Sequence, residues 1–420
     1  MTSRERVLQT LNHREPDLIP LDLGSSGVTG MQVSSVYKLR QALTLDPPGT
    51  PVKVVEPYQM LGEIAPDLME ALGVDVVGFG PPENLFGFRN ERWKEWRLFD
   101  GTPVLVPGEF NTEPESNGDI LMYPGGDKSA APSGRMPHGG YYFDTIVRQD
   151  PIDDAVLNIH DNLEEFPPVT DAALRHFEAE ATRLRSTGLA VLGNFGGTAF
   201  GDIALVPGMW LKHPKGIRDM TEWYTSTLTR RDHIYEIFYR QCEIALGNLK
   251  RIAAILGDLV DVVFMSGADF GAQHGPFISP DVLRDLYKPF QSRLNHWIHE
   301  NTSWKTFIHS CGSVRVFYDD FLEAEYDILN PVQCSAAHMD PRELKAGFGS
   351  RAVFWGGAVD TQHTLPFGTP DEVRAEVRER IAIFRPGGGF VFNPIHNVQA
   401  GVPTENLLAL YETFSECRAY

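Results

Sequence analysis

Two side chains that can bind a metal ion, His309 and Cys311, lie two positions apart at the end of the short apolar segment 306–308. Residues i and i+2 of a β-strand point to the same side of a sheet, so this spacing places the imidazole and the thiol on one face. A zinc site with an open coordination position needs three protein ligands, and this pair supplies two. Cys334 and His396 are the candidates for the third ligand, and spacing alone does not choose between them. Without a third ligand, the pair would be a buried histidine and a buried cysteine in one strand.

The composition limits the class of protein and its partners. The chain has 420 residues, which exceeds an ordinary domain and suits an α/β barrel with an insertion. It carries 37 Lys and Arg against 56 Asp and Glu, for a formal net charge of −19. This acidic balance argues against nucleic acid or an anionic membrane as the main partner. No apolar run approaches the roughly 18 residues that a membrane span needs.

The cysteines and the N-terminal segment indicate the compartment. Four cysteines are scattered along the chain, too few for a disulfide framework, at positions Cys242, Cys311, Cys334 and Cys417. The first residues read as an amphipathic helix and not as a signal peptide. We therefore expect a reducing, cytoplasmic location, in which a functional cysteine is a ligand or a nucleophile.

Eight short apolar segments alternate with helical patterns along the chain. The predicted strands are 19–24, 74–80, 190–196, 260–265, 306–309, 326–331, 352–357 and 389–394. Helices are predicted over 281–300 and 370–384, the second with a threonine cap and a proline in its first turn. Eight β-α units predict a TIM barrel, an α/β fold whose chemistry lies where the strands end. Polar side chains fall at or just beyond these strand ends, namely Asp22, Asn194, Asp269, His309, Cys311, Asn330, Gln333 and Asn393.

One stretch, residues 93–142, breaks this alternation. Two alternating segments flank an Asp100-Gly101 turn, and further strand-like segments follow. We interpret 93–142 as a small antiparallel β insertion within a single barrel domain of residues 1–420. We expect it to cover part of the barrel mouth or to contact a partner.

The chain also resembles a known family along most of its length. The motifs that carry the resemblance are 4–8, 11–17, 19–20, 309–313, 329–333, 339–341, 354–357, 359–362, 393–399, 402–403 and 405–406. Together they are similar to the uroporphyrinogen decarboxylase (URO-D) superfamily, whose members fold as TIM barrels. True decarboxylases of that superfamily carry an arginine-rich segment after the first strand, where guanidinium groups pair with porphyrin carboxylates. Here the corresponding segment 22–31 contains no arginine.

The sequence is more similar to the zinc-dependent methyltransferase branch of the superfamily, which exchanges methyl groups with a corrinoid protein. In that branch the zinc ligands are an H-x-C pair and a third residue shortly before a Pro-x-Glu-Asn segment. Counting back from Pro403 places His396 there, where the family usually has cysteine. The resemblance thus implies zinc bound by His309, Cys311 and His396. Cys334 is then either a substitute ligand or a small apolar filler, and we favour the filler. No corrinoid-binding D-x-H-x-x-G string is present, so the corrinoid would ride on a separate partner protein.

Three further side chains complete the predicted site. We expect Asp269, Asn330 and Gln333 to bind or orient the substrate, which would be a small methylated compound, such as a methyl ether, or a thiol. The structural alternatives are that the amides of Asn330 and Gln333 tie loops together and that Asp269 caps a helix or a loop. A possible assembly is a homodimer. The alternative function is a metal-free decarboxylase on another carboxylated substrate, with Asp22 or Asp269 stabilising a protonated intermediate. A barrel that only binds or scaffolds has less reason to gather such residues at one mouth.

Overall fold

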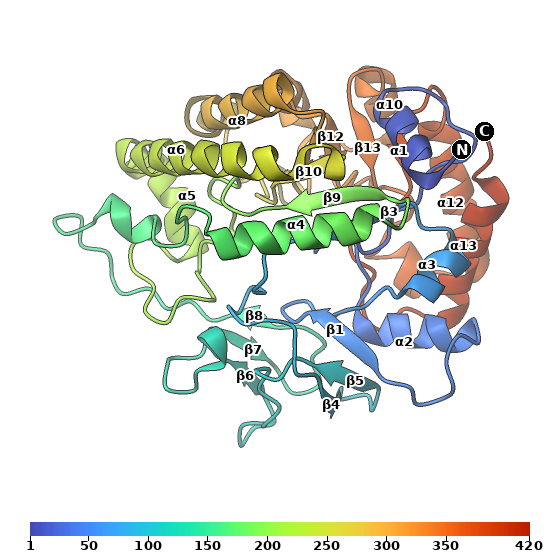
Figure 1. Cartoon of the computed structure of the whole chain (residues 1–420), viewed down its shortest axis with the longest axis horizontal. Helices are drawn as coiled ribbons and strands as arrows, with labels where there is room; N and C mark the ends of the chain where they lie inside the picture. Colours follow the sequence, from blue (N-terminus) through green and yellow to red (C-terminus); the bar gives the residue numbers. More distant parts are fainter.

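The computed structural model describes residues 1–420, and a parallel barrel lies at its centre (Figure 1). Seven parallel strands pair in the order β14-β13-β12-β11-β10-β9-β3. They are β3 (Val76–Phe79), β9 (Ala190–Asn194), β10 (Val262–Ser266), β11 (Lys305–His309), β12 (Ile328–Asn330), β13 (Val353–Trp355) and β14 (Phe390–Val391). The remaining gap is closed by parallel bridges from Leu21 to Phe392 and from Asp22 to Val76. The predicted TIM barrel is therefore confirmed, with the first predicted strand reduced to a two-residue link.

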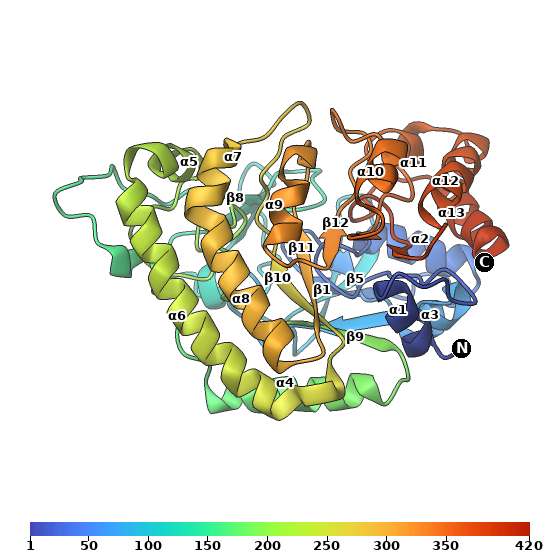
Figure 2. The same ribbon diagram turned by 90° about the horizontal axis from the view of Figure 1, so that it is seen from above.

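Helices cover the outside of the barrel (Figure 2). The helices that follow the barrel strands are α3 (Pro66–Leu72), α4 (Asp171–Arg185), α6 (Arg231–Leu256), α8 (Lys288–Asn301), α9 (Tyr318–Glu323), α10 (Pro341–Phe348), α12 (Pro370–Phe384) and α13 (Thr404–Cys417). Additional helices are α1 (Ser3–Leu11), α2 (Val33–Ala42), α5 (Met220–Thr229), α7 (Pro280–Val282) and α11 (Thr364–Phe367). The predicted helix 370–384 coincides with α12, whose capping box pairs Thr369 with Glu372. The predicted helix 281–300 is divided by a π-helical turn at Leu283–Tyr287 between α7 and α8.

Two apolar layers stabilise the barrel. A cluster of 11 buried residues fills its interior, including Phe307 of β11, Trp355 of β13 and two residues of α1, Val7 and Leu11. Helix α1 therefore closes the amino-terminal end of the barrel. A larger cluster of 89 residues packs between the strands and the surrounding helices, and it includes Ile308. Since Phe307 faces the interior and Ile308 the helices, the alternation of a strand directs His309 toward the interior at the other end.

The insertion forms two small sheets on one side of the barrel (Figure 1). The first has the order β2-β1-β5-β4 and the second β6-β7-β8. Their strands are β1 (Val52–Glu56), β2 (Leu61–Gly62), β4 (Lys94–Arg97), β5 (Pro103–Val106), β6 (Ile120–Met122), β7 (Gly134–Met136) and β8 (Asp144–Thr145). β4 and β5 form the antiparallel hairpin around Gly101, whereas β1 pairs with β5 in parallel. The boundaries 93–142 stay a prediction, since β1 and β2 precede that stretch and β8 follows it.

The chain ends lie side by side, and the N-terminal segment pairs with the C-terminal one (Figures 1 and 2). Leu18 bridges Ala419, and Arg418 forms an ion pair with Asp75 at 2.9 Å. No helix combines the length and the apolar composition that crossing a bilayer requires. The cytoplasmic location and the homodimer stay predictions.

Candidate metal centre at the barrel mouth

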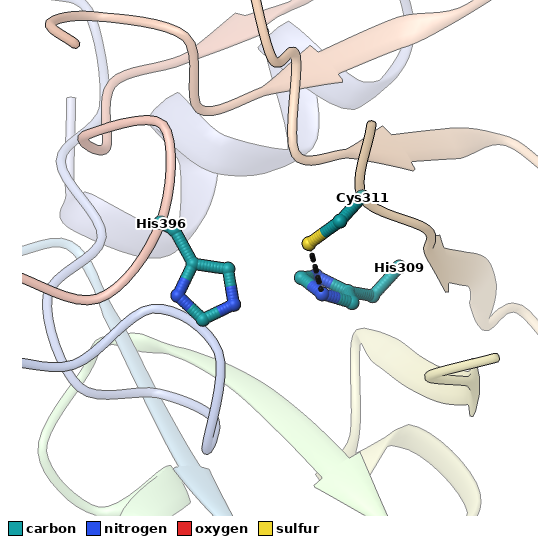
Figure 3. A group of neighbouring side chains, drawn as sticks. All are labelled: His309, Cys311 and His396. Carbon is teal, nitrogen blue, oxygen red and sulfur yellow. Dashed lines mark hydrogen bonds between the residues drawn. The ribbon is translucent and has the colours of Figure 1, made fainter. Parts of the chain in front are cut away.

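Three side chains that could bind a metal ion converge at the carboxyl end of the barrel (Figure 3). His309 is the last residue of β11, Cys311 lies just beyond it, and His396 lies in the loop after β14. Their potential ligand atoms are all within 4.8 Å of one another. Cys311 Sγ is 3.2 Å from His309 Nε2, close to the spacing of about 3.5 Å that two such ligands take in a tetrahedral zinc site. His396 lies 85 positions or more from His309 and Cys311 in the sequence, and the fold brings the three residues together.

The neighbouring strand fixes the orientation of His309. His309 Nδ1 lies 2.6 Å from Asn330 Oδ1 at the end of β12, and Asn330 Nδ2 donates to the carbonyl of Trp355 at 2.8 Å. Because the Asn330 amide donates on one side, its oxygen must face the imidazole and accept the Nδ1 hydrogen. His309 Nε2 then carries no hydrogen, and its lone pair points toward Cys311 and His396. This is the tautomer that a metal ligand requires.

Burial keeps both imidazoles neutral. It lowers the pKa of His309 to about 4, an effect that the Asn330 hydrogen bond partly opposes. Burial also lowers the pKa of His396 to about 4, and the neighbouring His309 adds to this shift. The pKa of the Cys311 thiol is raised well above its usual value by burial and by the negative charge of Asp269. Near neutral pH the metal-free protein therefore presents two neutral imidazoles and a protonated thiol.

Asp269 lies directly beside these three side chains, in the loop that follows β10. Its Oδ1 accepts the Cys311 backbone N–H at 2.6 Å and is 3.8 Å from His309 Nε2. Burial raises the pKa of Asp269, while the Cys311 N–H and His396 lower it. Its side chain is 27% exposed, so this carboxylate both holds the Cys311 backbone and faces the solvent-accessible mouth.

The other amides of the predicted site hold loops and ligands. Asn330 has both polar groups engaged, so it positions His309. Gln333 Oε1 accepts the Gly312 N–H at 2.7 Å, and its Nε2 donates to Gln273 Oε1 at 3.0 Å. Gln333 thus links the loop after β12 to the loop after Cys311. Substrate roles for Asp269, Asn330 and Gln333 stay predictions.

Two other residues considered from the sequence lie outside the cluster. Cys334 packs against the apolar layer, and burial raises the pKa of its thiol to about 12. Asp22 is fully buried and accepts hydrogen bonds from Ser25 Oγ and Trp355 Nε1, both at 2.8 Å. Burial raises the pKa of Asp22 to about 6. Its carboxylate therefore links the first barrel loop to Trp355 of β13 and offers no free surface to a substrate.

Asn397 has a role that the sequence reasoning did not identify. Its Oδ1 accepts the Gly30 N–H at 2.6 Å, and its Nδ2 donates to Gln59 Oε1 and to Gly27 O, both at 2.8 Å. These bonds tie the His396 loop to the first barrel loop and to the turn between β1 and β2. The turn between β1 and β2 thereby touches the loop that carries His396. The only sequence signal was that Asn397 is adjacent to a ligand candidate.

Comparisons with known proteins agree with this fold. Residues 227–417 match the family described as uroporphyrinogen decarboxylase (URO-D), while no curated protein matches the chain. A solved methyltransferase from Methanosarcina mazei is similar with a TM-score of 0.54 and 15% identity, over 99% of each chain. A D-psicose 3-epimerase reaches a TM-score of 0.33 at 8% identity, covering 61% of this chain and 85% of that chain. The predicted resemblance to the URO-D superfamily is confirmed, and the methyltransferase likeness shows the fold.

Proposed function

We propose that this chain, which carries a URO-D domain, is a zinc-dependent methyltransferase that moves a methyl group between a small methylated compound or thiol and a separate corrinoid protein. The convergence of one thiol and two neutral imidazoles at the barrel mouth carries the proposal. A thiolate and two imidazoles are ligands that zinc accepts readily, and three protein ligands leave one coordination position for a substrate atom. The superfamily resemblance adds the corrinoid partner.

The residues present fit a zinc ion. His309, Cys311 and His396 would hold it, and Asn330 already fixes the tautomer that binding requires. A zinc ion there would act as a Lewis acid, favouring the thiolate form of a thiol or making an ether oxygen a better leaving group. Asp269 holds the Cys311 backbone and presents its carboxylate to the mouth, where it can orient the polar end of a substrate.

The charges at the mouth do not favour the decarboxylase hypothesis. A carboxylated substrate calls for arginine or lysine, as carboxylate recognition usually does. No lysine or arginine pairs with Asp269, and the His309 imidazole that lies 3.8 Å from it is neutral. Asp22, the other acid considered for that reaction, is 0% exposed.

Loss of methyl transfer on replacing one ligand tests the proposal. Purified native protein loaded with zinc is mixed with methylcobalamin and a small thiol, and demethylation of the cobalamin is followed by absorbance. We expect Cys311→Ser to lose activity by about 100-fold or more while retaining its folded circular dichroism spectrum. The matched control is Cys334→Ser, which changes a cysteine that is half-buried like Cys311 but lies outside the cluster, and it should retain activity. Equal activity in native protein and Cys311→Ser would contradict the metal role.

A further inference from the structure

A nearly buried carboxylate without a cationic partner lies next to the proposed metal site. Asp202, in the long loop after β9, is 8% exposed, and its Oδ1 accepts the Ala204 N–H at 2.9 Å. Its Oδ2 lies close to Gly267, just beyond the carboxyl end of β10, since a Cβ atom added at Gly267 would be 2.9 Å from that oxygen. Gly267 is two residues before Asp269. Burial, together with the charge of Asp269, raises the pKa of Asp202 to about 7.

An aromatic pair lies beside Asp269. The Tyr224 hydroxyl donates to the backbone carbonyl of Asp269 at 2.7 Å. The ring of Tyr224 lies 5.4 Å from that of Phe277, and Phe277 remains 44% exposed. Burial raises the pKa of Tyr224, and the negative charges of Asp269 and Asp202 add to this shift. An exposed ring face beside carboxylates is the usual surround of an organic cation.

No basic side chain offsets the carboxylate of Asp202. A divalent ion bound by one thiolate and two neutral imidazoles would keep a net charge of about +1, and at about pH 8 the carboxylate of Asp202 on this side of β10 is ionised. Neither Asp202 nor Asp269 forms an ion pair with lysine or arginine, and the buried Arg218 is already paired with Glu165 at 2.7 Å. Beside Asp202 an anionic tail on the substrate would therefore be repelled, and a cationic tail attracted.

We propose that the substrate of this site carries a cationic ammonium group, which binds against Asp202 and the exposed ring of Phe277 while its sulfur or oxygen atom faces the metal ligands. The inference rests on the proposed function, since it assigns the substrate class of the same site. Asp202 is then the specificity-determining residue. Its carboxylate is held by the Ala204 N–H on one oxygen and offers the other to the ammonium group.

Three small thiols that differ in the charge of their tails test this assignment. Cysteamine is cationic, mercaptoethanol is neutral and mercaptoethanesulfonate is anionic. Each is titrated into full-length protein loaded with Co(II) in place of zinc at about pH 8, where Asp202 is ionised, and binding is followed through the sulfur-to-cobalt absorption. We expect cysteamine to bind about tenfold more tightly than mercaptoethanesulfonate, with mercaptoethanol between them.

Two asparagine variants separate a local charge from the overall charge. Asp202→Asn keeps an oxygen for the Ala204 N–H and should remove about tenfold of the cysteamine affinity with little effect on mercaptoethanol. Asp258→Asn removes an exposed charge just before β10, at the other end of the barrel, and should leave all three affinities unchanged. If Asp202→Asn does not fold, the ranking of the three thiols on the native chain still decides.

The results distinguish this inference from the proposed function. Equal binding of all three thiols, tighter binding of the sulfonate, or equal effects of the two variants would overturn the ammonium assignment and leave the metal site standing. If no thiol changes the Co(II) absorption, the substrate does not reach the metal, and the proposed function fails together with the inference.

Discussion

Replacing Asn330 by alanine should weaken metal binding without changing any of the three ligands. Asn330 is 2% exposed, accepts from His309 Nδ1 at 2.6 Å and donates to Trp355 O at 2.8 Å. The change leaves one buried donor and one buried acceptor unpaired, at about 1–3 kcal/mol each. The donor left unpaired is the Nδ1–H of His309, and without this hydrogen bond the ring can rotate and change tautomer. We expect zinc affinity to fall by about 10- to 100-fold.

Competition between the metal-free protein and a chromogenic chelator measures this affinity, and urea denaturation measures stability. Asn295→Ala is the matched control, because Asn295 is also fully buried and donates to Ala324 O at 2.7 Å, but it lies on α8. It should lose stability and keep its zinc affinity. Asn330→Asp should keep binding zinc, since a carboxylate also accepts the Nδ1 hydrogen. Native zinc affinity in Asn330→Ala, or an equal loss in Asn295→Ala, would refute the reasoning.

Three other predictions follow from the buried titratable groups. Zinc binding should release about one proton between about pH 6 and pH 8, because both imidazoles are already neutral and only the Cys311 thiol must lose its proton. Calorimetry in buffers of different ionisation enthalpy measures the number of protons released, and release of two or more would contradict the assigned protonation states. The metal-free protein should lose stability as pH falls from 6.5 to about 4, by up to about 3 kcal/mol per histidine, because the unfolded chain binds protons that buried His309 and His396 do not; urea midpoints that stay constant across this range would disagree. Asp22→Asn should destabilise the fold by about 1–3 kcal/mol, since its carboxylate accepts from Ser25 and Trp355, yet leave zinc affinity unchanged; denaturation and chelator competition report the two effects, and lost zinc binding would argue against its purely structural place.

The barrel was predictable because its strands are short apolar segments that end at or just before glycine or polar residues. The first predicted strand, 19–24, is nevertheless reduced to bridges at Leu21 and Asp22, since it only closes the ring between β14 and β3. β1 and β2 were missed. β1 carries Lys53 and Glu56, and its parallel partner β5 lies about 50 residues further along the chain, a pairing that leaves no local pattern.

The candidate ligands were predictable, whereas their supports were not. The H-x-C spacing indicates two ligands, and the resemblance selects His396 over Cys334. The loop of His396 is positioned by Asn397 through contacts with Gly30 and Gln59, which lie more than 300 residues away in sequence. Asp202 lies in a long loop without periodicity, so only the folded chain shows that its carboxylate reaches the exit of β10.

The zinc content of protein purified without a histidine tag tests the central claim most directly, with His309→Ala and His396→Ala measured beside the native chain. The account predicts about one zinc ion per native chain and its loss in both variants. Zinc that stays bound in either variant, or a native chain that takes up none when zinc is supplied, would contradict a centre built from His309, Cys311 and His396.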